Sequence, residues 1–561
     1  MDAQTFHVVI GGEAGQGLVT LGELLIRILV KSGYHIFATQ NYMSRIRGGH
    51  NTFSIRIGID PIEAPQTTID MLVALDDATL HIHEAEMTPR VGVIIIDDAT
   101  TAQTACCIPV PFKKLADAHH RNIAALGVTA AFLGLAKSRV SEAVVAHFNS
   151  KDTTDTETNR AAVDAAYVWA DTASRPIPKL TPTRASAQRL VLNGNEALAL
   201  GALAGGVKFC AFYPMSPATS IMVNLAQHAE EMGLIVEQAE DEIAAINMVI
   251  GASFSGSRSM TATSGGGFAL MTEGISLSAM TETPVVIVVA QRPGPATGLP
   301  TRTEQSDLEF VLHAGHGEFP RAIFAPGSIE ACFTHMFQTF ALAEASQGPV
   351  FLLTDQFLAD AYRDVHPFEL GDASAPLFPQ QESATPPYQR YAFTTSGVSP
   401  RCLPGISPNI VTADSDEHDE RGHITEDLKV RSKMVEKRLQ KMKILLDNVV
   451  APAYDGETNP DILLISWGST KGAVDESASR MRAKGKTIGT LHFSQVWPLV
   501  PTQFLDQLHR ARHVVCIEGN ATGQFSRLIR RETGFSIDSL ITRYDGLPFT
   551  PEYILEGLAH V

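Results

Sequence analysis

The sequence contains few of the features that hold metal clusters, bind nucleic acid or cross membranes. Its six cysteines include no C-x-x-C pair, so we expect buried, reduced thiols, with no iron–sulfur cluster and no structural zinc in this chain. Lysine and arginine number 44 against 61 acidic residues, and the net charge of −17 argues against nucleic acid and an anionic membrane surface as partners. The absence of any apolar run long enough to span a bilayer predicts a soluble, cytoplasmic protein.

What remains is the composition of a folded α/β protein with several domains. At 561 residues, with 44% apolar and 19% charged residues, the chain is too long for one core and too apolar for disorder. Continuous apolar strands that alternate with helices are typical of parallel sheets covered on both faces. The predicted strands lie at 6–12, 70–77, 91–98, 207–213, 233–238, 259–264, 284–290, 321–326, 349–355, 461–469, 487–494 and 513–520. The main predicted helices lie at 18–33, 195–205, 242–256 and 428–448, and an irregular connector occupies 363–427.

The first motif is the glycine loop GGEAGQG at 11–17, between a strand and a helix. Glycines there let backbone N–H groups approach a phosphate, and the helix dipole favours an anion. No Lys-Ser/Thr follows the loop, so it is not a Walker A loop, and a ribose-binding acid is missing downstream. The alternative is tight packing of helix on strand. In SRIRGGHN, 44–51, Arg45, Arg47 and His50 either hold a phosphorylated ligand or form a charged turn.

The second motif is the acidic start of an apolar helix, VEQAEDEIAAINMVIGAS at 236–253. Acids at a helix start complement the dipole, and this accounts for Glu240 and Asp241. Glu242 differs because apolar residues follow it directly, which predicts a buried carboxylate. A buried carboxylate needs a partner, and one that shares a proton with a ligand nitrogen is a catalytic candidate.

Three further segments follow predicted strands. The loop 290–307 carries Arg292, Thr297 and Thr301 beyond a strand's carboxyl end, where open α/β sheets bind ligands, and arginine binds carboxylates bidentately. The corner YPMSP at 213–217 is stiffened by two prolines. The glycines of TSGGGFALMTEG, 263–274, offer either a flat backbone to a bulky group or a flexible loop. Farther along, the acids and histidines of 414–427 match no standard metal spacing and indicate solvated or interface charge.

Together these segments resemble the 2-oxoacid:ferredoxin oxidoreductases, and specifically the alpha subunit with the small gamma domain fused at its N-terminus. They follow the family order from residue 11 to about 440, and the combination is most similar to 2-oxoglutarate:ferredoxin oxidoreductase alpha subunits. The segments that carry the resemblance are GGEAGQG, SRIRGGHN, NEALALGALAGG, YPMSP, EDEIAAINMVIGAS, QRPGPATGLPTRTEQSD, GHGEFPR (315–321), SGVSPR (396–401) and EHDERGHITED (417–427).

The resemblance implies a multidomain α/β fold and a thiamine diphosphate-dependent reaction. The expected activity is reversible oxidative decarboxylation of 2-oxoglutarate with coenzyme A to succinyl-CoA, CO2 and reduced ferredoxin. The alternatives are another 2-oxoacid (branched-chain, aromatic or pyruvate), a transketolase-like or dehydrogenase-like thiamine enzyme, and a non-catalytic scaffold that binds coenzyme A. The implied domains are a parallel-sheet gamma domain at 1–180, a pyrimidine-binding domain at 190–370, a connector with a charged helix at 371–455, and a transketolase C-terminal-like domain at 456–561.

By the same resemblance, Glu242 matches the glutamate that engages the aminopyrimidine of thiamine diphosphate, and Arg292 matches the arginine that pairs with the substrate carboxylate. Where the family corner reads Tyr-Pro-Ile-Thr-Pro, this chain has Met215 and Ser216, so the hydroxyl is kept and the methyl group is lost. The remaining implied contacts are Ser216, Thr297 and Thr301 for the substrate, Tyr213 for the cofactor, and Gly11, Gly12, Gly15, Gln16, Gly17 and Arg47 for coenzyme A. Glu13 stands where the family often has glycine, and it would weaken anion binding unless it points away.

Two parts of the family's machinery are missing from the sequence. There is no Gly-Asp-Gly with a downstream Asn to hold Mg²⁺ and the diphosphate, and there are no cysteines for a [4Fe–4S] cluster. The resemblance therefore implies a beta subunit that supplies both, an (αβ)2 assembly, and ferredoxin as electron acceptor. The acidic segment 414–427 is a candidate for the interface with that subunit.

Overall fold

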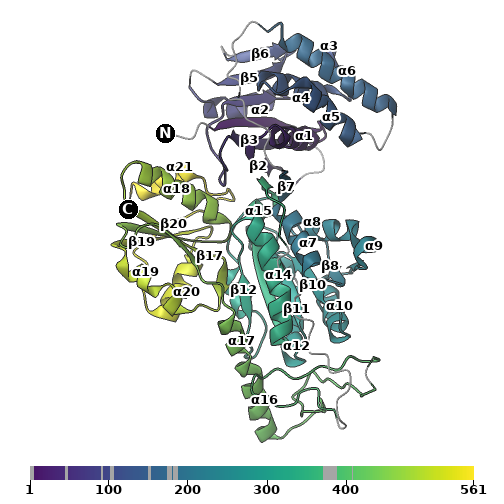
Figure 1. The fold of residues 1–561 in the computed structure, drawn as a ribbon, viewed down its shortest axis with the longest axis vertical. Coiled ribbons are helices and arrows are strands. Elements are labelled where there is room, and N and C mark those ends of the chain that lie inside the picture. The colour runs from purple at the N-terminus through teal and green to yellow at the C-terminus, as the bar shows by residue number, and fades with distance from the viewer. Residues whose placement is uncertain are drawn as a thin grey trace. The chain divides into compact units, whose positions relative to one another are not determined.

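A computed structural model describes residues 5–44, 48–89, 92–100, 106–148, 153–173, 180, 188–369, 388–406 and 408–560 of the chain (Figure 1). The chain forms two compact units. Unit 1 comprises Met1–Leu192, Ala361–Pro367 and Thr550–Glu552, and unit 2 comprises Asn193–Asp360, Phe368–Phe549 and Tyr553–Val561. Across the described ranges, no helix is both long enough and apolar enough to cross a membrane.

Unit 1 is built on an eight-stranded mixed sheet with the order β6-β5-β4-β1-β3-β2-β14-β7. The predicted parallel strands are confirmed, because β1, β4, β5 and β6 run parallel to one another. β3 is antiparallel to both β1 and β2, and β14 is antiparallel to β2. The strands are β1 (Phe6–Glu13), β2 (His35–Asn41), β3 (His50–Gly58), β4 (Met71–Ala74), β5 (Val93–Asp97), β6 (Cys107–Val110), β7 (Leu190–Asn193) and β14 (Tyr362–Val365).

Helices cover both faces of this sheet, as the alternation of side chains along β1 requires. Val8 and Ile10 point into the larger core together with residues of α1 and α4, whereas Val9 joins a smaller cluster that includes Leu80 of α2. The helices are α1 (Leu18–Lys31), α2 (Asp77–His83), η1 (Glu84–Glu86), α3 (Phe112–Leu115), α4 (Arg121–Phe132), α5 (Lys137–Phe148) and α6 (Thr153–Ala170).

Unit 2 contains a seven-stranded sheet of order β18-β12-β13-β11-β10-β8-β9 and a five-stranded sheet of order β15-β17-β16-β19-β20. One hydrophobic core runs through both, from Ile287 of β11 to Leu463 of β16. Each strand predicted from 207 onward is present. The strands are β8 (Phe209–Phe212), β9 (Ile235–Gln238), β10 (Ser259–Thr263), β11 (Val285–Gln291), β12 (Ala322–Phe324), β13 (Pro349–Asp355), β15 (Ala453–Asp455), β16 (Ile462–Trp467), β17 (Ile488–Phe493), β18 (Gln495–Trp497), β19 (His513–Glu518) and β20 (Ser539–Thr542).

Helices pack on both sheets of unit 2, and the predicted apolar helix over 242–256 is confirmed. The first group is α7 (Gly194–Ala204), α8 (Thr219–Gln227), α9 (Ala229–Met232), α10 (Glu242–Phe254), α11 (Gly265–Leu270), α12 (Thr272–Met280), α13 (Leu308–His313), α14 (Ile329–Ser346) and α15 (Gln356–Asp360). The second group is α16 (Leu428–Gln440), α17 (Met442–Asp447), η2 (Gly468–Thr470), α18 (Lys471–Ala483), η3 (Pro501–Gln503), α19 (Leu505–Arg510), α20 (Gln524–Thr533) and α21 (Pro551–Leu558).

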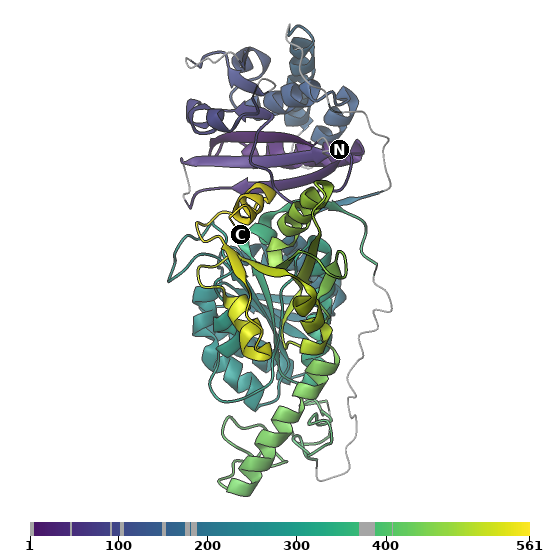
Figure 2. The same cartoon turned by 90° about the vertical axis from the view of Figure 1, so that its left-hand side faces the viewer.

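The charged helix α16 lies beside the irregular residues 388–406 and 408–427 (Figure 2), and a buried ionic cluster holds it against the rest of unit 2. Glu282, which is fully buried, accepts hydrogen bonds at 2.7 Å from Lys437 and forms an ion pair at 2.5 Å with Lys441. Burial opposes ionisation of Glu282, but the two lysines outweigh it and hold its pKa at about 2. Within the predicted interface segment, Glu417 pairs with Arg438 of α16 at 2.9 Å.

Candidate active site

Glu242 occupies the first position of α10 and turns inward. The preceding Asp241 caps the helix by accepting a hydrogen bond from the backbone N–H of Ala244 at 2.7 Å. Glu242 is only 3% exposed, so its predicted burial is confirmed. Its Oε1 has no hydrogen-bond partner among the described residues. A buried carboxylate oxygen without a partner marks a place where a hydrogen-bonding ligand fits.

The glycines after β10 make room for this carboxylate. A Cβ at Gly267 would lie 2.3 Å from Oε1 of Glu242 and 2.1 Å from Oγ1 of Thr263. The hydroxyls of Thr263 and Ser264 are buried, and neither has a partner within the described ranges. Of the two sequence-based alternatives for this segment, a flexible loop is wrong, because Gly265–Leu270 is the short helix α11. The unsatisfied hydroxyl oxygens of Thr263 and Ser264, beside a glycine backbone, suit a flat ring that offers a hydrogen-bond donor.

Arg292 and the corner at 213–217 meet in the structure. Arg292 follows β11, and its Nη1 donates to the carbonyl oxygen of Ser216 at 2.8 Å. Asn195 of α7 secures the corner by donating to the carbonyl of Pro217 at 2.8 Å and to Oγ of Ser220 at 2.6 Å. The corner therefore orients the guanidinium, while the Ser216 side chain stays exposed.

Asp307 is a site residue that sequence reasoning missed. A Cβ at Gly265 would lie 2.4 Å from its Oδ2, which is buried and without a partner in the described part of the chain. Burial raises the pKa of Asp307 to about 6, although the positive charge of Arg292 acts in the opposite direction. In sequence it looks like an ordinary N-cap of α13, yet its side chain makes no cap hydrogen bond.

The other predicted pocket residues are exposed or half-buried. Tyr213 is 39% exposed, Thr297 is exposed and Thr301 is half-buried. Thr297 lies next to Gly298, whose φ is 53°, and a Cβ at Gly298 would lie 1.8 Å from the Pro293 carbonyl oxygen, so this position requires glycine. The described contacts do not join Tyr213, Thr297 or Thr301 to Glu242, so their ligand roles stay predictions.

In unit 1 the glycine loop serves two purposes. A Cβ at Gly11 would lie 2.4 Å from Thr79, and one at Gly12 would lie 2.3 Å from Oε1 of Gln16, so tight packing explains these two. Gln16 is turned back toward the loop, where its Oε1 accepts from the backbone N–H of Glu13 at 3.0 Å. Gly15, by contrast, has a φ of 98° and no atom within 4 Å of a Cβ position.

Gly15, Gln16 and Gly17 line a cavity of about 280 Å³ together with three residues that sequence reasoning missed: His119, Arg121 and Asn122. The N-termini of α1 and α4 both begin at this cavity, and each favours an anion. Nε of Arg121 is buried and has no partner among the described residues. Glu13 lines a neighbouring hollow and not this cavity, whereas a different acid, Asp97, lines both. The predicted contact Arg47 lies outside the described residues.

Comparison with known proteins adds two family models. Residues 200–437 match the model described as pyruvate flavodoxin/ferredoxin oxidoreductase, thiamine diphosphate-binding. Residues 7–169 match the model described as pyruvate ferredoxin/flavodoxin oxidoreductase. The two models together cover most of the chain, and the first contains the described residues around Glu242 and Arg292.

Individual relatives are similar to this chain over nearly its full length. The chain is 32% identical to the 2-oxoacid:ferredoxin oxidoreductase subunit alpha of Sulfolobus sp, over 99% of this chain and 96% of that one. It is 30% identical to the 2-oxoglutarate synthase subunit KorA of Methanothermobacter marburgensis, over 65% of this chain and 97% of that one. Among solved structures, the 2-oxoglutarate:ferredoxin oxidoreductase from Magnetococcus marinus matches with a TM-score of 0.92 and 29% identity, over 99% of both chains. That structure has 2-oxoglutarate, coenzyme A and succinyl-CoA bound.

Proposed function

This chain belongs to the family of 2-oxoacid:ferredoxin oxidoreductases, as an alpha subunit, and we propose that its 2-oxoacid is 2-oxoglutarate. The reaction is the reversible conversion of 2-oxoglutarate and coenzyme A to succinyl-CoA and CO2, with two electrons passed to ferredoxin. The support for this substrate is the full-length likeness to a solved enzyme with 2-oxoglutarate and succinyl-CoA bound.

The single observation that carries the catalytic proposal is the buried, unpartnered Oε1 of Glu242 beside Gly267. Thiamine diphosphate, when bound, supplies a carbon nucleophile and an electron sink for decarboxylation. Glu242 would hold its aminopyrimidine ring through a hydrogen bond to a ring nitrogen and share a proton at that atom. The buried hydroxyls of Thr263 and Ser264, which have no partner among the described residues, would offer further hydrogen bonds to that ring.

For the substrate, we assign the carboxylate contact to Arg292. One of its nitrogens is committed to the Ser216 carbonyl, and this contact fixes the plane of the guanidinium. A fork held in one plane suits bidentate binding of a carboxylate. Thr297 and Thr301 would line the same pocket, and Tyr213 would lie against the cofactor.

Coenzyme A would bind in unit 1, at the cavity lined by Gly15 and Gly17. Two helix N-termini and Arg121 would supply the positive potential that its phosphates need, against the negative charge of Asp97 in the same lining. The beta subunit would contribute Mg²⁺, the grip on the diphosphate and the [4Fe–4S] cluster, within an (αβ)2 assembly.

The test is co-expression with the beta subunit and measurement of 2-oxoacid-dependent reduction of a low-potential dye. We expect Glu242→Gln to lower kcat by about 10²–10⁴-fold, the range for loss of a general acid–base group. The matched control is Glu240→Gln, an exposed acid two residues earlier, with kcat unchanged. Full activity in Glu242→Gln would instead indicate the scaffold alternative. Equal rates with pyruvate, 2-oxoisovalerate and 2-oxoglutarate would overturn the substrate assignment and favour a general 2-oxoacid enzyme, as the Sulfolobus relative is named.

A further inference from the structure

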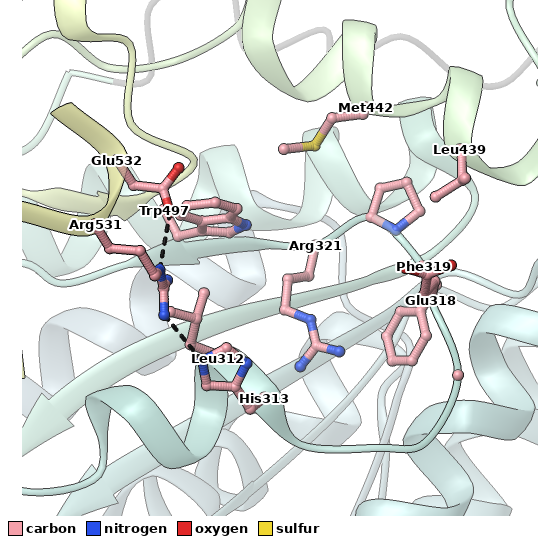
Figure 3. A pocket seen from close by; sticks show the side chains of 12 residues that line it. Leu312, His313, Glu318, Phe319, Arg321, Leu439, Met442, Trp497, Arg531 and Glu532 are labelled. Atoms are coloured by element: carbon pink, nitrogen blue, oxygen red, sulfur yellow. Dashed lines mark hydrogen bonds and ion pairs between the residues drawn. The ribbon is translucent and has the colours of Figure 1, made fainter. Parts of the chain in front are cut away.

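The GHGEFPR segment, 315–321, takes no part in the site around Glu242, but it shapes a second cavity in unit 2 (Figure 3). The cavity has a volume of about 430 Å³. It is bordered by the segment that follows α13, by α16 and α17, by β18 and by α20. Its walls combine the apolar side chains of Phe319, Leu439, Met442 and Trp497 with the guanidinium of Arg321.

Arg321 is 7% exposed, and its hydrogen bonds within the described residues all come from one nitrogen. Its Nη1 donates to the carbonyls of Val311 at 2.9 Å and Ala314 at 2.7 Å, which caps the C-terminal end of α13. The guanidinium carbon lies 4.4 Å from the centre of the Phe319 ring, a cation–π contact. Helix capping is the structural explanation for this arginine, but it uses a single nitrogen. Nε and Nη2 have no hydrogen-bond partner within the described ranges, and Figure 3 shows the guanidinium between His313 and Phe319.

Arg321 has no ion-pair partner in the described part of the chain, although two carboxylates, those of Glu318 and Glu532, also line the cavity. Burial lowers its pKa to about 10, so it remains a cation at neutral pH, and in the described part of the chain no carboxylate forms an ion pair with it. The second arginine of the cavity, Arg531, is already paired with Glu532 at 3.0 Å and contacts His313 at 3.1 Å. A buried cation without a counter-charge is costly, and an anion in the cavity removes that cost.

We propose that this cavity binds a carboxylate carried on an apolar or aromatic body. The free edge of Arg321 holds the carboxylate, and Trp497, Met442 and Phe319 pack against the body. One arginine without an ion-pair partner, apolar walls and the nearby Glu318 carboxylate fit a monoanion better than a phosphate dianion, which needs several donors and would be repelled more strongly by Glu318. The carboxylate comes either from a free organic acid or from the partner subunit, and these sources are distinguishable by experiment.

The probe is 4-fluorobenzoate, whose fluorine resonance reports binding to the full-length chain, alone and in complex with its beta subunit. We expect saturable line broadening with the wild-type chain and none with the uncharged 4-fluorobenzamide. Arg321→Gln should weaken binding at least tenfold, about 1.4 kcal/mol. Met442→Trp, which fills the cavity and leaves the helix cap in place, should also abolish binding. The matched control is Arg527→Gln, an exposed arginine on α20 that lies outside the lining, with binding unchanged.

Binding to both the isolated chain and the complex would identify a free acid as the ligand. Binding to the isolated chain alone would indicate that a carboxylate of the partner subunit fills the cavity in the assembly. The proposal is overturned if the wild-type chain shows no saturable broadening in either state. It is also overturned if Arg321→Gln and Met442→Trp bind the probe as tightly as Arg527→Gln.

Discussion

Two glycine-rich segments of this molecule, 11–17 in unit 1 and 264–267 in unit 2, look alike in sequence and work differently. Each spans the junction between a strand and the helix that follows it. In the first, Gly15 has positive φ and open space around it at the edge of a cavity. In the second, the glycines are helical, and the carboxylates of Glu242 and Asp307 occupy the space where Gly267 and Gly265 lack a side chain. The first segment leaves space for a ligand, while the second leaves space for carboxylates of the protein itself.

The largest effect should come from adding a methyl group in the second segment. Gly267→Ala places a Cβ 2.3 Å from Oε1 of Glu242, so the carboxylate must move away from the position at which it meets the cofactor. We expect kcat for dye reduction to fall as far as in Glu242→Gln, on the order of 10²–10⁴-fold. Overpacking should also lower the free energy of unfolding by about 1–3 kcal/mol, measured by chemical denaturation.

The control for this substitution is Gly348→Ala, where the nearest atom to the added Cβ is a carbonyl oxygen 4.0 Å away. Its kcat and unfolding midpoint should match those of the wild-type chain. Normal catalysis in Gly267→Ala would show that the space at this glycine does not position Glu242. The proposed difference between the two glycine segments would then be wrong.

Much of this architecture could be predicted from sequence, because strands such as 284–290 are continuous apolar runs and Glu242 is followed directly by apolar residues. The antiparallel β14, by contrast, lies more than 300 residues beyond the strand with which it pairs, and no local pattern reports such a pairing. Asp307 resembles a routine N-cap, and only packing against Gly265 reveals its burial. Arg121 is more than 100 residues from the glycine loop, so its place at the cavity depends on tertiary structure alone.

The pH dependence of stability tests the second segment further. The pKa of Asp307 is raised from 3.8 to about 6 in the folded state, so folding favours its protonated form. Its contribution is therefore fully present below pH 4 and is lost as the pH rises through 6, about 3 kcal/mol at 1.4 kcal/mol per pKa unit. Asp307→Asn should remove this decline, and the difference between the two unfolding free energies should grow from pH 4 to pH 6 and then stay level. A constant difference across that range would show that Asp307 ionises as a solvated carboxyl does.

In the first segment, a substitution should change the binding of the ligand rather than the stability of the protein. Arg121→Gln removes a cation from the cavity at the glycine loop, and we expect the KM for coenzyme A to rise about tenfold, as for loss of a hydrogen bond to a charged group. The KM for 2-oxoglutarate should not change, because Arg292 lies in unit 2. The matched control is Arg160→Gln, an exposed arginine of α6, which should leave both constants unaltered. Equal changes in the two variants would contradict the assignment of this cavity to coenzyme A.

The smallest effect should come from Gly15→Ala, which separates backbone strain from steric conflict. With a φ of 98°, alanine at this position costs about 1–2 kcal/mol of unfolding free energy, yet its methyl group meets no protein atom within 4 Å. The Gly15→Ala variant should therefore keep its activity at saturating coenzyme A. Gly267 has no positive φ, so Gly267→Ala causes no backbone strain there, but it should lose activity. If glycine serves conformation in one segment and space in the other, chemical denaturation should show similar losses of stability in the two variants, whereas dye reduction should fall in Gly267→Ala alone. A loss of activity in Gly15→Ala as large as in Gly267→Ala would mean that one physical cause explains both.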